Sequence, residues 1–89
     1  MKTITRTNRF DKDVKKMKKR GKSFEDFKRV IEKLVSDVTL EPKYRDHKLV
    51  GNHAGTRECH IEPDWLLVYM NSDEELLLVR TGSHADLFG

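Results

Sequence analysis

The sequence predicts an α+β fold in which an N-terminal strand and a helical hairpin pack on a small, mostly antiparallel sheet. Two observations predict this class. Apolar residues recur with a helical period before residue 40, and the period changes to two after residue 55. A short C-terminal segment follows the last predicted strand. Because the 89 residues contain neither repeats nor low-complexity tracts, residues 1–89 are expected to form a single domain.

The first half indicates a short strand and two amphipathic helices. Thr3-Ile4-Thr5 favours a strand, and Asn8 is expected to cap the first helix. Ser23, with Asp26 three residues later, predicts a capping box for a second helix that Pro42 stops. A tight turn between the two makes them an αα-hairpin. The apolar stripes are Phe10, Val14 and Met17 in the first helix and Phe24, Phe27, Val30, Ile31, Leu34, Val35 and Val38 in the second.

The second half indicates strands joined by short turns. In the first of them, Glu58 and His60 should point to one face, with Cys59 on the other. Pro63 interrupts this strand. The next strand is apolar on both faces, which predicts that it is central. The expected elements are a loop at 39–55, strands at 56–62, 65–70 and 76–80, and a hairpin turn at 71–74.

Charge is distributed unevenly along the chain. Residues 1–50 carry 16 Lys and Arg against 8 Asp and Glu, whereas residues 51–89 carry 2 against 7, for a net charge of +3. A strongly basic first half favours a polyanionic partner, either nucleic acid or an acidic protein. A solvated, lysine-rich helix face is the alternative explanation.

The cellular compartment is expected to be the cytoplasm. No apolar run approaches the roughly 18 residues that a membrane span needs, so no membrane partner is expected. The first residues lead straight into polar ones, which argues against a secretory signal. The single cysteine, Cys59, cannot form an internal disulfide and suits a reducing compartment.

Histidines and a carboxylate interrupt the strand pattern of the second half. Imidazoles titrate near neutral pH, so two or three around one cleft can move protons on a substrate without a metal. RNA can be cut with its own 2′-hydroxyl as nucleophile. That reaction needs a base for the hydroxyl proton, an acid for the leaving 5′-oxygen and a cation for the phosphate. The candidate acid–base residues are His47, His60, Asp64 and His84, and the candidate substrate-binding residues are Trp65, Arg80 and Phe88.

Several of these candidates also have a plain structural interpretation. Asp64 after Pro63 can simply cap a turn, and a lone strand histidine is usually a hydrogen-bonded structural residue. Trp65 at a strand start suits the core, and Phe88 can pin the C-terminus. Glu58 is interpreted as solvent-facing. Sequence spacing alone leaves both interpretations open.

A metal site is the main competitor. Cys59 and His60 are neighbours in a predicted strand, so their side chains point to opposite faces and cannot share an ion. The chain has no HxH, HxxxH or CxxC spacing. We therefore expect no metal cofactor, although zinc held by His47, His60, Asp64 and His84 stays an alternative.

Four phrases between Tyr44 and Gly89, about half the chain, carry a family resemblance. They are Tyr44-Arg45-Asp46-His47, Arg57-Glu58-Cys59-His60-Ile61-Glu62-Pro63-Asp64-Trp65, Leu67-Val68-Tyr69 and Arg80-Thr81-Gly82-Ser83-His84-Ala85-Asp86-Leu87-Phe88-Gly89. Together with the predicted order of elements, these phrases resemble the YafQ branch of the RelE superfamily, bacterial toxins that cleave mRNA.

The resemblance implies a RelE-like fold, metal-free cleavage of mRNA in the ribosomal A site, and a cognate antitoxin that neutralises the toxin. Glu58 falls where some family members have aspartate. The family's catalytic positions match His47, His60, Asp64 and His84, and its RNA-placing positions match Trp65, Arg80 and Phe88.

The leading hypothesis is a ribosome-dependent endoribonuclease. Asp64 or His60 would accept the 2′-hydroxyl proton, and His84 would protonate the leaving oxygen. Arg80 would steady the phosphate, and His47 would be a second base or an orienting group. Three alternatives stay open: a non-catalytic, basic nucleic-acid-binding or regulatory module, a ParE-type toxin with another target such as a DNA topoisomerase, and a metal-dependent hydrolase.

Overall fold

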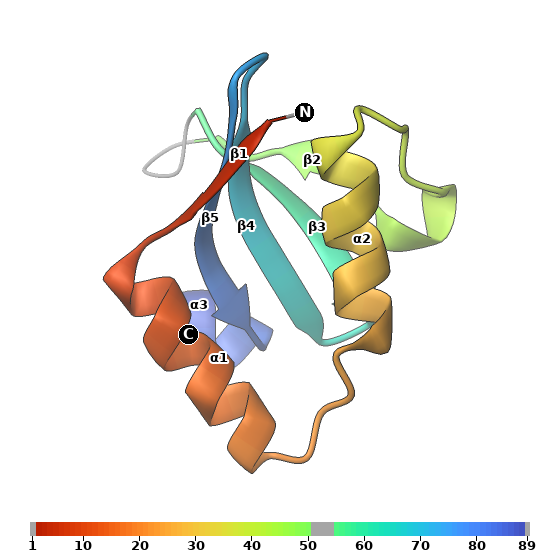
Figure 1. Cartoon of the computed structure of the whole chain (residues 1–89). Helices are drawn as coiled ribbons and strands as arrows, with labels where there is room; N and C mark the ends of the chain where they lie inside the picture. The colour runs from red at the N-terminus through yellow and green to blue at the C-terminus, as the bar shows by residue number, and fades with distance from the viewer. Residues whose placement is uncertain (1, 51–54, 89) are drawn as a thin grey trace.

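Five strands form one mixed sheet in the computed structural model, which describes residues 2–50 and 55–88. The elements are β1 (Thr3–Arg6), α1 (Asn8–Lys19), α2 (Glu25–Val35), the 3₁₀ helix η1 (Pro42–Tyr44), β2 (His47–Lys48), β3 (Arg57–Glu62), β4 (Trp65–Asn71), β5 (Glu75–Gly82) and α3 (His84–Phe88). The strand order is β1-β5-β4-β3-β2, with β1 parallel to β5 and the other neighbouring pairs antiparallel. The predicted α+β class is confirmed (Figure 1).

The two long helices begin differently from the sequence-based expectation. Thr7, rather than Asn8, caps α1, and its Oγ1 accepts a hydrogen bond from the Phe10 N–H at 3.0 Å. The capping box predicted for α2 is wrong, because Phe24 takes the cap position and no side chain caps the helix. The Phe24 ring packs edge-on against Trp65, with centroids 5.1 Å apart. Packing of this aromatic ring therefore fixes the start of α2 in place of a capping bond.

α2 ends well before Pro42, so the predicted stop is wrong. Val35 is its last residue, and Asp37 takes a left-handed conformation with a φ of 56°. The Val38 N–H then donates to the Lys33 carbonyl at 2.9 Å, which closes the helix end in a Schellman arrangement. Pro42 instead begins η1, where its fixed φ suits the first position of a helical turn.

The predicted loop at 39–55 contains two short elements, η1 and β2, that the sequence did not reveal. Its part at 51–54 lies outside the described residues. β2 pairs with the start of β3, and His47 stands opposite Glu58 in that register. A strand of two residues has too little alternation to be recognised from sequence, yet this one positions a candidate histidine.

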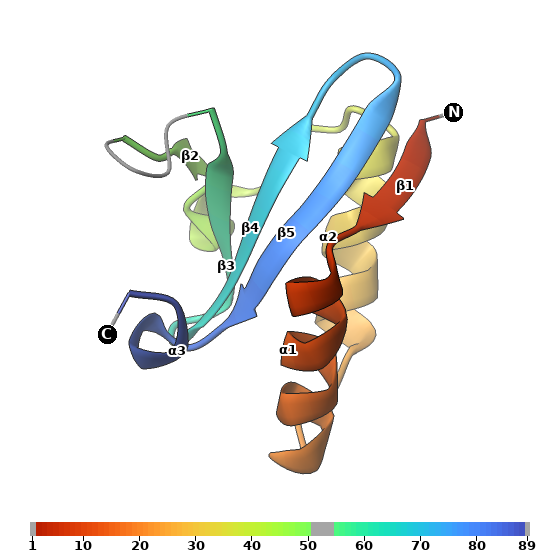
Figure 2. The same ribbon diagram turned by 90° about the vertical axis from the view of Figure 1, so that its left-hand side faces the viewer.

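The two faces of the sheet are covered differently. α1 and α2 lie on one face and run in opposite directions, which confirms the predicted helical hairpin (Figures 1 and 2). The core lies between these helices and the sheet, and Phe10 and Phe27 stack within it with ring centroids 6.1 Å apart. Leu66 and Val68 of β4 are also buried, but they alternate with the core residues and face the side where α3 lies (Figure 2).

β4 occupies the middle of the sheet, as its apolar faces predicted. Its pairing with β3 shifts register between His60 and Glu62, and such a bulge re-aims the neighbouring side chains. The turn predicted at 71–74 is confirmed by a bond from the Ser72 N–H to the Glu75 carbonyl at 2.9 Å. Among the described helices, none has the length and apolar character that crossing a membrane requires.

Candidate functional site

Three histidines from separate segments form a row on the sheet face opposite α1 and α2. His47 comes from β2, His60 from β3 and His84 from the start of α3. The ring centroids of His47 and His60 are 6.4 Å apart, and those of His60 and His84 are 5.6 Å apart. The fold therefore brings together imidazoles that are far apart in the sequence. We call this set the histidine row.

Glu58 lies between two members of this row and is buried, so its interpretation as solvent-facing is wrong. Its side chain is 7% exposed, and Oε2 lies 3.2 Å from His47 Nε2 and 3.8 Å from His60 Nε2. Within the described part of the chain, Oε1 has no hydrogen-bond partner. Burying a carboxyl oxygen without a hydrogen bond costs free energy of folding. Oε1 is therefore an acceptor that a hydrogen bond from a ligand could satisfy.

His84 is held by Asp64, which lies in the turn between β3 and β4. Oδ1 of Asp64 accepts hydrogen bonds from the His84 backbone N–H at 3.0 Å and from its Nδ1 at 2.8 Å. These bonds, with the backbone bond contributing most, lower the pKa of Asp64 below its ordinary value. An ionised carboxylate can only accept, so Nδ1 carries a proton and Nε2 is the nitrogen available to a ligand.

Asp86 fixes α3, and with it His84, to α1. Its carboxylate accepts from the Ser83 N–H at 2.9 Å, while Ser83 Oγ accepts from the Asp86 N–H at 3.1 Å, which is a capping box. The same carboxylate pairs with Arg20 at 2.6 and 3.0 Å and with Lys16 at 3.0 Å. The hydrogen bonds from Arg20 are the largest cause that holds the pKa of Asp86 far below its ordinary value.

Trp65 lies in the core rather than at the surface. Its ring has no exposed area, and it packs against Phe24 and Phe27 with centroids 5.1 and 5.7 Å away. Its indole N–H donates to Thr81 Oγ1 at 2.8 Å. A nucleobase cannot stack on a ring that has no exposed face, so the structure contradicts the prediction of Trp65 as a stacking platform.

Arg80 and Phe88 occupy the other two predicted binding positions. Nε and Nη2 of Arg80 donate to Asp13 at 2.8 and 3.1 Å, and these bonds raise the pKa of the guanidinium. Asp13 also accepts the Thr81 N–H at 3.2 Å. Among the described residues, none accepts a hydrogen bond from Nη1 of Arg80. Phe88, on α3, is 45% exposed.

The donor set does not form a ready metal site. Among residues 2–50 and 55–88, no group of three or more His, Cys, Asp or Glu side chains is arranged to hold an ion. Cys59 is fully buried in the core, on the opposite face of β3 from His60 as predicted, and burial raises the pKa of its thiol. The row instead pairs imidazoles with carboxylates.

Two residues of this site, Glu58 and Asp86, lie outside the set of candidates predicted from the sequence. Strand alternation places Glu58 on the face of His60, but the two residues of β2 that pair beside it have no recognisable sequence pattern. Asp86 follows Ser83 by three residues, and this capping-box spacing is a sequence signal for it.

Fold and sequence both match known bacterial toxins. The family model described as a bacterial toxin of type II toxin-antitoxin system, YafQ, matches residues 2–89. The mRNA interferase toxin YafQ of Escherichia coli (strain K12) is 40% identical over 87 residues, which are 97% of this chain and 95% of that protein. A copper-bound mutant toxin from Helicobacter pylori is 40% identical with a TM-score of 0.94, over 99% of this chain and 100% of its own. The toxin-like chain of the E. coli DinJ-YafQ complex is 39% identical with a TM-score of 0.92, over 100% of both chains.

These likenesses extend over almost the whole chain, and with the fold they define the class: toxins of bacterial type II toxin-antitoxin systems. Within that class, the chain belongs to the YafQ family. The resemblance drawn from four phrases of sequence is thereby confirmed.

Proposed function

We propose that this toxin is an endoribonuclease that cleaves mRNA with the RNA 2′-hydroxyl as nucleophile. The E. coli relative named an mRNA interferase toxin supports this proposal. The observation that carries it is a pair of imidazole–carboxylate couples, His60 with Glu58 and His84 with Asp64, whose imidazole centroids lie 5.6 Å apart. A base and an acid on the two sides of one phosphate are what this reaction needs.

In the proposed reaction, His60 accepts the 2′-hydroxyl proton as that oxygen attacks phosphorus. The bond from phosphorus to the 5′-oxygen breaks, His84 donates a proton to the leaving oxygen, and a 2′,3′-cyclic phosphate remains. Glu58 orients His60 and stabilises the imidazolium that forms, and Asp64 directs Nε2 of His84 to the substrate.

The remaining candidates have supporting positions. Asp64 is a weaker candidate for the base than His60. Two hydrogen bonds from His84 occupy its Oδ1, and they lower the pKa of this carboxyl group. His47 shares Glu58 with His60 and acts as a second base or as an orienting group. Arg80 offers Nη1 to the phosphate while Asp13 holds the rest of its guanidinium.

We further propose ribosome-bound mRNA as the substrate and a cognate antitoxin as the partner. The complex of DinJ with YafQ supports a protein partner, and the basic first half suits ribosomal RNA or an acidic antitoxin. Expression of this chain alone is expected to arrest growth, and co-expression of its antitoxin to restore it. Binding to ribosomes is expected to weaken steeply as salt rises.

Cleavage of mRNA on programmed ribosomes tests the chemistry. His60→Ala and His84→Ala are each expected to lower the rate by about 10²- to 10⁴-fold. Thr39→Ala, an exposed change away from the row, is the control and should cut normally. Folded histidine variants that cut within about threefold of wild type reject the assignment.

Two further arms separate the alternatives. The acid–base mechanism predicts full activity in the presence of a chelator. A metal-dependent hydrolase, which the copper-bound H. pylori toxin raises as an alternative, would lose its activity in chelator. A non-catalytic binding module would bind ribosomes without cutting mRNA. Parallel assays with and without ribosomes show whether free mRNA is a substrate.

A further inference from the structure

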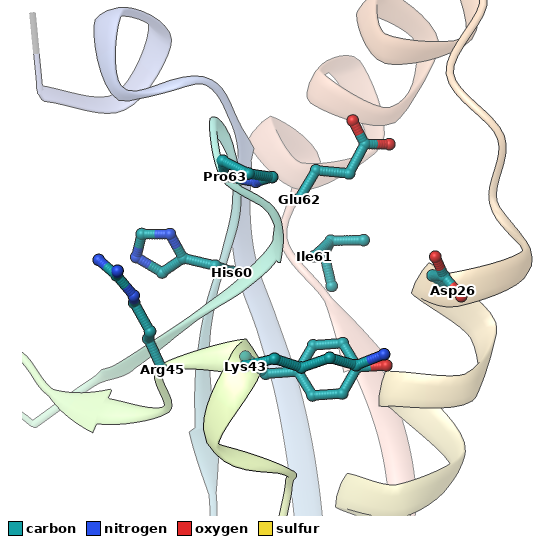
Figure 3. A pocket seen from close by; sticks show the side chains of 8 residues that line it. Asp26, Lys43, Arg45, His60, Ile61, Glu62 and Pro63 are labelled. Atoms are coloured by element: carbon teal, nitrogen blue, oxygen red, sulfur yellow. The ribbon is translucent and has the colours of Figure 1, made fainter.

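A pocket of about 360 Å³ opens beside the histidine row, between η1 and the end of β3 (Figure 3). This volume lies in the range of small-molecule sites and suits one nucleotide. Pro63 lines it with exposed apolar surface, whereas Ile61 is only 6% exposed. Lys43 and Arg45 line it with positive charge. Two carboxylates line it as well, but each has a cation of its own: Glu62 pairs with Lys22 at 3.0 Å and Asp26 with Arg29 at 3.3 Å. We call it the Arg45 pocket. His60 lines it as well, so an occupant would be adjacent to whatever binds at the row.

The edge of β3 from His60 to Glu62, with which no described strand pairs, forms one wall of this pocket. β2 pairs only with Arg57 and Glu58, so within the described chain no strand covers that edge from His60 onward. An open strand edge offers backbone N–H and C=O groups to a ligand. The Arg45 pocket thus combines apolar surface for a base, hydrogen-bonding groups for its edge and cations for a phosphate.

Arg45 differs from the other arginines of this region in its partners. Arg57 and Arg80 each pair with an aspartate, whereas among the described residues no carboxylate pairs with Arg45. In Figure 3 its side chain extends along the same side of the pocket as the His60 imidazole. Its carbonyl accepts a hydrogen bond from His47 Nδ1 at 2.6 Å, and its backbone is left-handed with φ 48° and ψ 44°. The backbone of Arg45 is therefore bonded directly to the histidine row.

We propose that the Arg45 pocket binds the nucleotide next to the scissile phosphate, with the guanidinium on that nucleotide's phosphate and the base against Pro63. The inference rests on the proposed function, because it takes His60 as the place where the RNA is cut. Arg45 here is a substrate-binding residue that adds to the partial phosphate contact of Arg80. Its loss should raise KM more than it lowers kcat.

The test uses a 2′-O-methyl trinucleotide, which cannot be cleaved, so that binding is measured without chemistry. Arg45→Gln is expected to weaken binding about tenfold, the loss of one charge-assisted contact. It should also reduce the slope of log affinity against log salt by about 0.7, the value for one phosphate contact on a single strand. Arg45→Lys should retain the slope. Arg9→Gln, an exposed arginine on α1, is the matched control and should change neither quantity.

Chemical shifts locate the binding. The amides of Ile61 and Glu62 are expected to shift in wild type at millimolar trinucleotide, and much less in Arg45→Gln. Unshifted amides, or Arg45→Gln that binds as tightly as wild type, overturn the pocket proposal. If Arg45→Gln has a lower melting temperature than wild type, Lys43→Gln replaces it as the test of the positive charge that lines the pocket. The two proposals can fail separately. If the pocket amides shift but His60→Ala and His84→Ala still cleave mRNA, the proposed function is refuted and binding at the Arg45 pocket is not.

Discussion

At the scale of single residues, Glu58 shows how one buried carboxylate can serve two imidazoles. Its Oε2 faces His47 and His60, and within the described chain its Oε1 has no partner. A carboxyl group kept in so dry a position costs free energy that an apolar residue would avoid. That cost is offset if the reaction uses the charge, because imidazolium forms beside it when His60 takes a proton.

Glu58→Gln tests this interpretation. In the proposed reaction, positive charge forms on the imidazole that faces this carboxyl group, so its loss should lower kcat by about tenfold or more. Cleavage of mRNA on ribosomes under single-turnover conditions measures kcat. Glu75→Gln, an exposed change on β5, is the control and should cut at the wild-type rate. An unchanged kcat in folded Glu58→Gln would contradict coupling between Glu58 and the proposed reacting imidazole.

Trp65→Phe separates packing from RNA contact at the same scale. The change keeps an aromatic ring but leaves a small void and removes the bond to Thr81. We expect the free energy of unfolding to fall by about 2 kcal/mol, measured by urea denaturation. The cleavage rate per folded molecule should stay at the wild-type level. A tenfold loss of rate in folded protein would restore a role for Trp65 in RNA binding.

At the scale of elements, α3 is short and depends on its connections to α1 and β5. Gly82, the last residue of β5, allows α3 to approach this strand closely, because a Cβ there would lie 3.0 Å from both Cβ and Oδ2 of Asp86. Arg20 and Lys16 of α1 then hold the same carboxylate. The position of His84 is thus determined by residues at the other end of the sequence.

Asp86→Asn is expected to loosen α3 without unfolding the protein. The amide oxygen can still cap the Ser83 N–H, but the ion pairs with Arg20 and Lys16 are lost. Since displacement of a catalytic group by about 1 Å can cost up to 10²-fold, we expect kcat to fall about ten- to a hundredfold. Asp11→Asn, which breaks the exposed pair with Arg6, is the matched control and should have little effect. Equal kcat in both variants would contradict the anchoring of His84 by Asp86.

At the scale of the whole molecule, depressed carboxylate pKa values predict loss of stability in acid. Asp86 and Asp64 have lower pKa values in the folded protein, so the unfolded chain binds their protons first as pH falls. Their contribution to the free energy of unfolding is complete above about pH 5 and declines below about pH 4, near the ordinary carboxylate range. Urea midpoints at pH 7, 5 and 3 measure this decline, and Asp86→Asn should flatten it. A midpoint that is constant down to pH 3 would contradict the prediction.

The sequence predicted the parts of this molecule whose pattern is long and local. β4 is apolar on both faces for six residues, and the apolar stripe of α2 spans three turns, so the apolar pattern alone identified these two elements. It could not predict β2, because two residues carry no period, or the Asp13–Arg80 pair, whose partners lie 67 positions apart. Trp65 was ambiguous for a related reason. A tryptophan at a strand start can be covered or open, and the covering rings of α2 decide which.

The pairing of β1 with β5 has a consequence for synthesis. Thr3 aligns with Glu75 and Arg6 with Leu78, so the first strand of a nascent chain has no place in the sheet until most of the polypeptide has emerged. α3, which supplies His84, comes later still. A growing chain consequently holds its imidazoles apart until α3 has left the ribosome and β1 has paired with β5.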